Sequence, residues 1–285
     1  MFSNSGAAGR CGRGGYMSLV QVEIDGRMAI VTLNRPEKHN ALNAEMMVRM
    51  AEAWDGLAQD DSIRVVLVTG TGERAFCTGA DLGSLAPLAT GAKTAQTRFE
   101  KQWVDGHQDL VDRALLRHTR FHKPVVAAVN GLAVAAGFEL MLAADIRVAS
   151  TAATFQLSEV RRGLIPSGGA LARLPRQVGW SHAMEIILAA DVIDAERALS
   201  MGLVNRIVAP SEVYATAKDM CGRISEGAPL ALKKAKEAIA RSSGCELGRA
   251  FEIEQACQAV VLASEDAREG PRAFMERRTP RFTGR

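Results

Sequence analysis

Two glutamates in the middle of the chain, Glu139 and Glu159, are the residues whose type and surroundings best suit catalysis. Glu139 lies in the first turn of an expected helix, AVAAGFELMLAAD, which is apolar on nearly every side and therefore belongs in a core. Glu159 follows the point at which the apolar segment 153–157 ends. An ionised carboxylate inside a protein is costly unless it is paired or has a function. Two such glutamates, with small residues between them, predict general acid/base chemistry beside a pocket lined by backbone.

Two short apolar strands are expected to position this chemistry. Residues 124–129 form an apolar run that predicts a strand buried on both faces, directly before the helix of Glu139. Residues 65–69 form a second such strand, which opens into the Gly-rich loop 70–85. Loops of this kind let backbone N–H groups approach an anion or a carbonyl oxygen, so this loop is a candidate wall of the pocket.

The other expected elements alternate strands with helices up to residue 208 and are helical beyond it. Mixed elements followed by a run of helices predict an α/β core with a helical appendage. The expected elements are a hairpin of strands 19–24 and 28–33 around Asp25-Gly26, a helix over 44–58 capped by Asn43, one long amphipathic helix over 94–119, helices over 175–190 and 195–201, a strand over 203–208, a helix from a Ser211 cap to about residue 226, and helices over 229–275.

Composition narrows the class of protein. The 285 residues are 47% hydrophobic, which suits one large domain or a domain with an extension. Lys and Arg total 35 against 32 Asp and Glu, so the charge gives no reason to expect a nucleic-acid partner. No apolar run approaches the ~20 residues of a membrane span. Residues 1–16 lack the apolar region of a secretory signal and are expected to be a disordered leader.

Cysteines and histidines give no metal signature. The five cysteines form no CxxC or Cys/His pattern, which predicts reduced thiols in a cytoplasmic protein. Cys77 is expected to be a packed thiol rather than a nucleophile, because the sequence places no histidine base beside it. His107, His118 and His122 are expected on a solvated helix face. The basic ending RRTPRFTGR suits either phosphate binding or a solvated tail, and the sequence leaves both open.

Seven ordered motifs carry a family resemblance. They are NRPEKHNALN, AFCTGADL, KPVVAAVNG, AAGFELMLAAD, FQLSEVRRGLIP, GLVNRIV and FMERRTPRFTGR. In this order and spacing the chain resembles the crotonase (enoyl-CoA hydratase/isomerase) superfamily from about residue 17 to the end. The resemblance implies an α/β fold, with a β/α spiral core of repeated ββα units over residues 17–207 that holds the active site. It also implies a helical region over 208–285 that builds trimers, commonly paired into hexamers.

The same resemblance implies a substrate and site roles. The substrate is an acyl-CoA thioester, with no metal and no cofactor besides the coenzyme A of the substrate. Glu139 and Glu159 match the two catalytic glutamates of enoyl-CoA hydratases, and the backbone N–H groups of Thr78 and Ala136 form the oxyanion hole. The residues expected along the acyl-CoA are Arg35, Lys38, Ala41, Cys77, Ala80, Asp81, Leu82 and Ser167.

Three positions depart from the family pattern. Ala136 and Ser167 both stand where glycine is frequent, and Phe138 replaces a smaller residue. The N–H of Ala136 survives, provided that the position does not need a positive φ. Ser167 is expected to cap a helix that starts at Gly168, although its hydroxyl also suits a polar substrate. These changes leave the reaction class unaltered and the acyl group open.

Several alternatives remain at this point. Buried ion pairs, Glu139 with Arg147 and Glu159 with Arg161 or Arg162, explain the glutamates without catalysis, although the two occupied family positions favour catalysis. Hydration of a trans-2-enoyl-CoA is the favoured reaction. A Δ3-Δ2-enoyl-CoA isomerase needs one carboxylate, and the FELMLAAD stretch also resembles a carnitinyl-CoA dehydratase. A non-enzymatic acyl-CoA or RNA-binding protein is disfavoured, because helix 44–58 contains no lysine and neither glutamate is lost.

Overall fold

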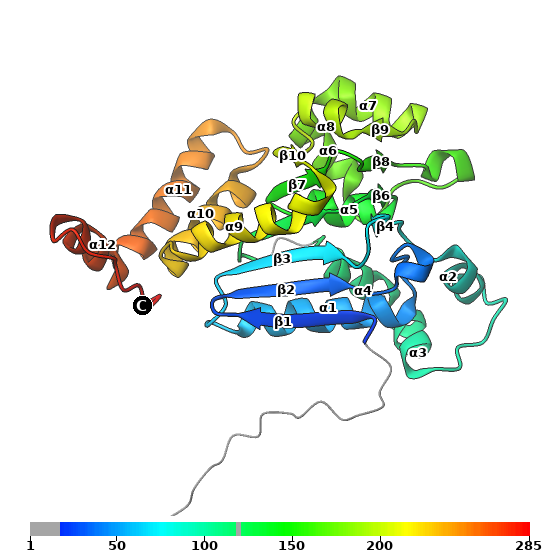
Figure 1. Cartoon of the computed structure of the whole chain (residues 1–285), viewed down its shortest axis with the longest axis horizontal. Coiled ribbons are helices and arrows are strands. Elements are labelled where there is room, and N and C mark those ends of the chain that lie inside the picture. Colours follow the sequence, from blue (N-terminus) through cyan, green and yellow to red (C-terminus); the bar gives the residue numbers. More distant parts are fainter. Residues whose placement is uncertain (1–17, 118–120) are drawn as a thin grey trace, which may run out of the picture.

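The chain begins with an antiparallel hairpin, as predicted. The computed structural model describes residues 18–117 and 121–285, so the expected leader over 1–16 lies outside the described residues. Strands β1 (Val20–Asp25) and β2 (Met28–Leu33) pair with Asp25 opposite Met28. The two turn residues include Gly26, whose φ of 58° is readily adopted by glycine. This hairpin starts the larger of two sheets (Figure 1).

The strands form two sheets, and successive strands of the chain alternate between them from β3 to β8. The larger has the order β1-β2-β3-β5-β7-β10, and the smaller has the order β4-β6-β8-β9. Within both, neighbouring strands are parallel except for β1 with β2 and β8 with β9. Each successive strand pair, β3 with β4, β5 with β6 and β7 with β8, gives one strand to each sheet, so the chain describes a spiral. The bounds are β3 (Val65–Gly70), β4 (Ala75–Cys77), β5 (Val125–Val129), β6 (Leu132–Val134), β7 (Ile146–Ser150), β8 (Thr154–Gln156), β9 (Ile193–Asp194) and β10 (Arg206–Val208).

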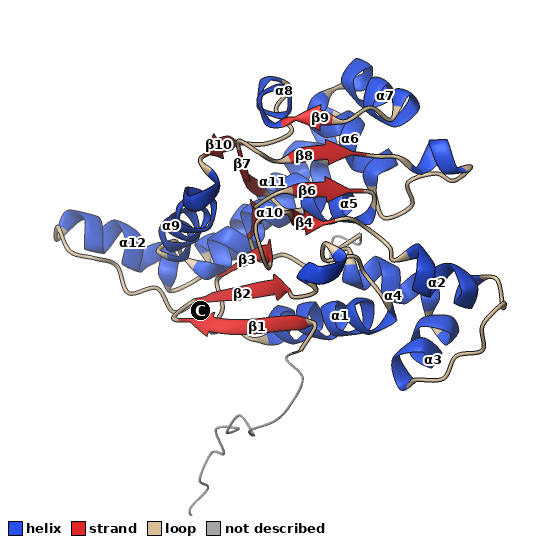
Figure 2. Ribbon diagram, turned by 45° about the vertical axis from the view of Figure 1, so that its right-hand side comes forward, coloured by secondary structure: helices blue, strands red, loops and turns tan. Residues whose placement is uncertain are grey.

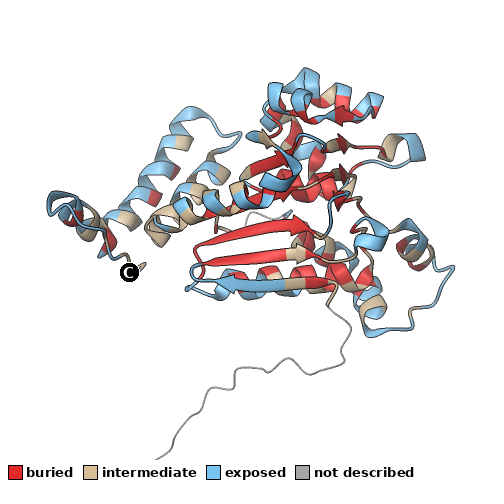
Figure 3. Ribbon diagram, in the orientation of Figure 1, coloured by how far each residue is buried: buried red, intermediate tan, exposed pale blue. Residues whose placement is uncertain are grey.

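Helices follow the strand pairs and cover both faces of the larger sheet (Figure 2). On one face, α9 packs its buried side chains Val213, Ala217 and Cys221 against β3, β5 and β7. On the other face lies α1, whose buried stripe of Met47, Met50, Trp54 and Leu57 was predicted from its spacing. Figure 3 shows strands β2 and β3 of this sheet as buried, whereas the outer strand β1 is largely exposed. The helix bounds are α1 (Ala44–Gln59), α2 (Leu82–Ala89), α5 (Ala136–Ala143), α6 (Ala170–Val178), α7 (Trp180–Ala189), α8 (Ala195–Ser200) and α9 (Val213–Ser225), with short 3₁₀ turns η1 (Pro36–Lys38), η2 (Glu159–Arg162) and η3 (Pro210–Glu212).

Two predicted helices are each divided by a glycine. The single helix expected over 94–119 is wrong, because Gly106 separates α3 (Arg98–Asp105) from α4 (His107–Ala114). A capping box of Thr97 and Glu100 starts α3. The helix expected over 175–190 is likewise two helices, α6 and α7, separated by Gly179 with φ 81°. His118 lies outside the described residues.

The last described elements are helices, as the sequence predicts. After β10, the chain forms α9, α10 (Pro229–Ser242), α11 (Leu247–Leu262) and α12 (Asp266–Met275), and the last three extend away from the sheets (Figure 1). The predicted Ser211 cap is wrong, because Ser211 lies within η3 and α9 begins at Val213. None of the helices in the described ranges combines the length and apolar character that a bilayer crossing requires.

Candidate active site

Glu139 and Glu159 lie on neighbouring turns of the spiral. Glu139 is in the first turn of α5, directly after β6, and is 3% exposed. Glu159 opens η2, three residues after β8 ends. Strands β6 and β8 are parallel neighbours in the smaller sheet, so the segments that follow them leave the same edge. This topology explains why two glutamates twenty positions apart in the sequence reach one site.

Backbone N–H groups hold the carboxylate of Glu139. Its Oε1 accepts hydrogen bonds from the N–H of Gly168 at 2.7 Å and of Ala170 at 3.1 Å. Both donors lie at the start of α6, where the first N–H groups of a helix have no partner within it. Glu139 therefore takes the capping role that was predicted for Ser167, and that prediction is wrong. The N-cap of α6 is Gly169, and Ser167 is exposed beside the donors.

The buried ion pair proposed for Glu139 is not formed. The guanidinium of Arg147 is saturated by the carbonyl oxygens of Met141, Leu142, Ala144 and Leu203 and by Oε1 of Gln177. Arg147 thus caps the end of α5 and leaves the carboxylate alone. The two backbone donors are neutral, and within residues 18–117 and 121–285 no cation makes a direct contact with the charge of Glu139.

Glu159 is held differently. Arg161 pairs with Asp191 at 2.6 Å, so the ion pair of Arg161 with Glu159 is also absent. Arg162 donates to the carbonyl oxygen of Ser158 at 3.1 Å and acts on Glu159 through its charge. The Oε2 atom of Glu159 is buried and receives no hydrogen bond from the atoms of residues 18–117 and 121–285. A buried acceptor without a donor is typical of a group that works on a ligand.

Burial shifts both carboxyl groups toward the neutral form. It raises the pKa of Glu139 to about 7, against the lowering effect of the Ala170 and Gly168 N–H groups. The charge of Glu159 raises the pKa of Glu139 further, and the charge of Arg173 lowers it. Burial also raises the pKa of Glu159. Two coupled carboxyl groups whose pKa values are both raised are suited to general acid/base catalysis.

The proposed oxyanion donors are brought together by close backbone contact. A Cβ on Gly137 would lie 2.0 Å from the carbonyl oxygen of Cys77, and a Cβ on Gly79 would lie 2.9 Å from the nitrogen of Ala136. Glycine at these two positions therefore lets the end of β4 and the start of α5 touch. The N–H of Thr78 donates to the carbonyl oxygen of His39 at 3.2 Å, a long hydrogen bond. The N–H of Ala136 stands at the N-terminus of α5, where the helix dipole favours negative charge.

The positive φ that was considered for Ala136 occurs instead at the preceding residue, Ala135. Ala136 is the first residue of α5 and does not have a positive φ. Ala135 has φ 51° and ψ −125°, a conformation that disfavours any residue with a Cβ. The sequence interpretation missed this residue, since consecutive alanines before a helix carry no turn signal.

The loops expected to follow the coenzyme A lie against each other. Nη1 of Arg35 contacts Oδ2 of Asp81 at 2.7 Å and the carbonyl oxygen of Ala41 at 3.0 Å. Leu42 forms a parallel bridge with Ala80, so the two loops are joined by backbone as well. Arg35 and Asp81 thus hold the loops together.

The remaining predicted contacts divide into exposed and buried side chains. Lys38 and Leu82 are exposed beside the joined loops. Cys77 is fully buried in β4, and burial raises the pKa of its thiol to about 12, as expected of a packed thiol. The thiol therefore does not act as a nucleophile at neutral pH.

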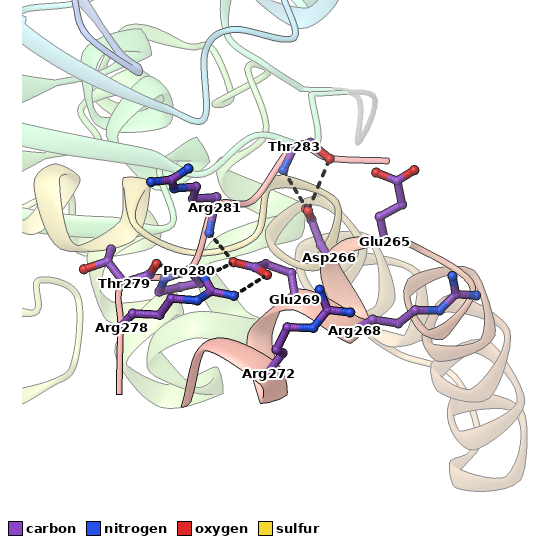
Figure 4. Close-up of a pocket in the computed structure, with 10 residues that line it drawn as sticks. All are labelled: Glu265, Asp266, Arg268, Glu269, Arg272, Arg278, Thr279, Pro280, Arg281 and Thr283. Atoms are coloured by element: carbon purple, nitrogen blue, oxygen red, sulfur yellow. Dashed lines mark hydrogen bonds and ion pairs between the residues drawn. The ribbon is translucent and has the colours of Figure 1, made fainter. Parts of the chain in front are cut away.

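A large cavity lies elsewhere, at the C-terminus. Its volume is about 880 Å³, and it opens between α12 and the last residues of the chain (Figure 4). The tail folds back on α12: the N–H groups of Thr283 and Gly284 donate to Asp266, and Arg278 pairs with Glu269. The basic ending is therefore partly neutralised and is not simply a solvated tail. No predicted site residue lines this cavity. Within the described residues, no cluster of three or more His, Cys, Asp and Glu side chains is arranged to hold a metal ion.

Known proteins are similar to this chain in sequence and in structure. A short-chain-enoyl-CoA hydratase of Clostridium acetobutylicum is 35% identical over 261 residues, 91% of this chain and 95% of that protein. Enoyl-CoA hydratase EchA19 of Mycobacterium tuberculosis is 37% identical over 264 residues, 93% and 96% of the two chains. A crystal structure of enoyl-CoA hydratase from Bacillus anthracis matches with a TM-score of 0.84 and 30% identity, covering 93% of this chain and 99% of that one.

These similarities confirm the predicted fold, an α/β spiral core with C-terminal helices. The family described as Enoyl-CoA hydratase/isomerase matches residues 23–285, nearly the whole described chain. The chain belongs to the enoyl-CoA hydratase/isomerase family.

Proposed function

We propose that the protein is an enoyl-CoA hydratase, which reversibly adds water to a trans-2-enoyl-CoA thioester. The observation that carries this proposal is the carboxylate pair. Glu139 is fixed by the N–H groups of Gly168 and Ala170, and the buried Oε2 atom of Glu159 has no donor in the part of the chain that the structure describes. Two carboxyl groups that share a site can manage the two protons that hydration moves.

Hydration requires two proton transfers, and each glutamate carries out one of them. Glu139 accepts a proton from water as the water oxygen forms its bond to the β-carbon. The electrons of the double bond move toward the thioester, and negative charge develops on its oxygen. Glu159 gives a proton to the α-carbon, on the same face. Each step contributes about 10²–10⁴-fold to the rate in enzymes of this kind. The two glutamates can exchange these roles if they titrate as one unit.

The thioester oxygen would lie between the N–H groups of Thr78 and Ala136. Donors fixed before the reaction stabilise this charge without reorganisation, and one such donor is worth about 2.7–4 kcal/mol of barrier elsewhere. The N–H of Thr78 exchanges the long hydrogen bond to His39 for the thioester oxygen when substrate binds. No metal or separate cofactor enters these steps.

Hydration explains the site better than the alternatives. Isomerisation moves one proton between carbons and needs one carboxyl group, whereas one buried and one half-buried carboxyl group are maintained here at a cost in stability. A carnitinyl-CoA dehydratase would use the same machinery on another acyl group. A binding protein would not require two neighbouring acidic groups whose pKa values are both raised.

The test is the hydration of crotonyl-CoA, followed by the loss of enoyl thioester absorbance. Glu139→Gln and Glu159→Gln are each expected to lower kcat by at least about 10²-fold. Glu185→Gln is the matched control, because Glu185 forms an exposed ion pair with Arg197 on α7 and α8. Wild-type turnover in both active-site variants would refute the assignment. A panel of 2-enoyl, 3-enoyl and 3-hydroxyacyl-CoA esters then distinguishes hydratase, isomerase and dehydratase.

We also propose that the protein assembles as a homotrimer or a pair of trimers. Helix α10 has no buried residue, and the C-terminal helices expose large apolar side chains. Phe274 and Met275 are 81% and 80% exposed, which is unusual unless another subunit covers them. A monomer in sedimentation equilibrium would contradict this proposal. Free thiols at Cys77, Cys221, Cys245 and Cys257 support a reducing, cytoplasmic location.

A further inference from the structure

Arg173 follows, in the sequence, the residues Gly168 and Ala170, whose N–H groups bind Glu139. It belongs to the first turns of α6, the helix whose start donates two hydrogen bonds to the Glu139 carboxylate. Its Nη2 donates to the carbonyl oxygens of Leu116 and Arg117, just beyond the end of α4. Arg173 therefore ties the loop that carries Gly168 to a different element of the fold.

The contacts around Gly168 leave little freedom for this arrangement. A Cβ on Gly168 would lie 2.5 Å from Oε2 of Glu139 and 2.5 Å from Cδ1 of Leu115. The end of α4, the glycine loop and the carboxylate thus meet at one point. A shift of α6 relative to α4 would move the donors of Glu139, and the guanidinium of Arg173 fixes these two elements.

One nitrogen of the Arg173 guanidinium is not used in these hydrogen bonds. This nitrogen, Nη1, is buried and donates to no acceptor among the residues that the structure describes. A Cβ on Gly169 would lie 2.8 Å from this nitrogen, so Nη1 faces the glycine loop. Arg147 makes the contrast, because its guanidinium donates to five protein acceptors. The charged groups that interact with Arg173 are the acids Glu139 and Asp145 and the cations Arg117, Arg147 and Lys236.

We propose that Arg173 is a positioning residue for the hydration reaction, which anchors the loop that holds Glu139 and supplies the cation that favours one negative charge on the carboxyl pair. This inference rests on the proposed function. The charged groups that act on Glu139 are Glu159 from η2 and Arg173 from α6, and Arg162 acts on Glu159. Arg173 is the cation that opposes this repulsion, in addition to the neutral N–H groups of Ala170 and Gly168, so its removal favours the protonated form of Glu139.

The experiment compares pH profiles of kcat/KM for crotonyl-CoA hydration in the wild type, Arg173→Gln and Arg173→Lys. In the wild type, the acid limb is expected near pH 7, where one carboxyl group of the pair ionises. In Arg173→Gln the acid limb moves to higher pH by about one unit, because the cation no longer favours the ionised form. Arg173→Lys keeps the charge but not the fork, so its acid limb stays in place while kcat falls.

Arg176→Gln is the matched control. Arg176 is one turn further along α6, is exposed and donates to the carbonyl oxygen of Ala172 on its own helix. Its removal changes the net charge equally and is expected to leave the acid limb unchanged.

Two outcomes overturn the inference. An acid limb that stays at the wild-type pH in Arg173→Gln shows that Arg173 is a structural residue alone. An equal shift in Arg176→Gln shows that net charge is the cause. If Arg173→Gln is too weak for kinetics, a ¹³C-carboxyl NMR titration of Glu139, identified by its loss in Glu139→Gln, reads the same shift without turnover. Failure of the wild type to hydrate crotonyl-CoA would instead count against the proposed function, while the NMR titration still tests Arg173.

Discussion

Oε1 of Glu139 lies 2.7 Å from the backbone nitrogen of Gly168, so a buried carboxylate and the start of a helix satisfy each other. This contact and the hydrogen bond from the N–H of Ala170, the first residue of α6, give the carboxylate a fixed orientation and give that N–H group a partner. It does not offset the whole cost of burial, because neutral donors replace bulk water only in part. The pKa of Glu139 is raised to about 7 for this reason.

The raised pKa predicts that the protein loses stability as the pH rises. The pKa of Glu139 in the folded state, about 7, is above the ordinary value of 4.5 for glutamate. The folded state therefore holds a proton that the unfolded state has released, and the unfolding free energy falls between these two pH values. Glu139→Gln removes this dependence and keeps an acceptor for Gly168. The variant is expected to be more stable than the wild type above pH 7, by on the order of 2 kcal/mol.

Urea denaturation at pH 5 and pH 8 checks this expectation. The stability gain of Glu139→Gln should be small at pH 5 and large at pH 8. Glu185→Gln on the surface serves as the control and should show no such difference. An equal gain at both pH values would show that Glu139 is not a strained acid.

The contact between β4 and α5 predicts that Gly137 tolerates no side chain. A Cβ at this position would lie 2.0 Å from the backbone oxygen of Cys77, so the two segments must separate. Gly137→Ala is expected to cost about 1–3 kcal/mol or more of stability and to abolish hydration, because the oxyanion donors move apart. Gly56→Ala is the matched control. Gly56 lies within α1 with nothing within 4 Å of its Cβ position, and alanine there should stabilise by about 1 kcal/mol.

The strained backbone at Ala135 predicts a substitution that stabilises the fold. Glycine adopts φ 51° and ψ −125° without the clash that a Cβ causes, so Ala135→Gly should raise the unfolding free energy by about 1 kcal/mol. Ala133→Gly, two residues earlier in β6, should instead destabilise, because it removes a fully buried methyl group without relieving strain. Thermal unfolding of the two variants distinguishes them. Destabilisation by Ala135→Gly would mean that the methyl group contributes more in packing than it costs in strain.

The elements that were predictable share long, apolar or strongly punctuated sequences. The runs 65–69 and 124–129 are buried on both faces, and their sequence contains little else than apolar residues. The hairpin around Gly26 and the Asn43 cap of α1 follow from local backbone chemistry. Strands β4, β6 and β8 have three residues each, which is too short for a period to appear.

The candidate site was only partly predictable for a related reason. The glutamates are recognisable by their type and apolar surroundings, but their partners are backbone N–H groups of Gly168 and Ala170. Every residue except proline has a backbone N–H group, so a backbone donor cannot be recognised from the residue type. The same applies to the hydrogen bond between Thr78 and His39, which depends on how two distant loops meet. Side-chain chemistry was therefore visible in the sequence, while the groups that orient it were not.

The joined loops at the expected coenzyme A site give the last prediction. Arg35 and Asp81 were each expected to contact the substrate, yet their side chains contact each other at 2.7 Å and are mostly buried. Loss of either partner breaks the same ion pair between the two loops. Arg35→Gln and Asp81→Asn should therefore each lower the affinity for coenzyme A, and the double variant should have the same affinity as each single variant. A coupling energy of about 1 kcal/mol or more is expected in a double-mutant cycle measured by calorimetry. The exposed pair Arg197 and Glu185 between α8 and α7 is the control, and its removal should leave the affinity unchanged. Additive losses at Arg35 and Asp81 would instead mean that each side chain contacts the coenzyme A by itself.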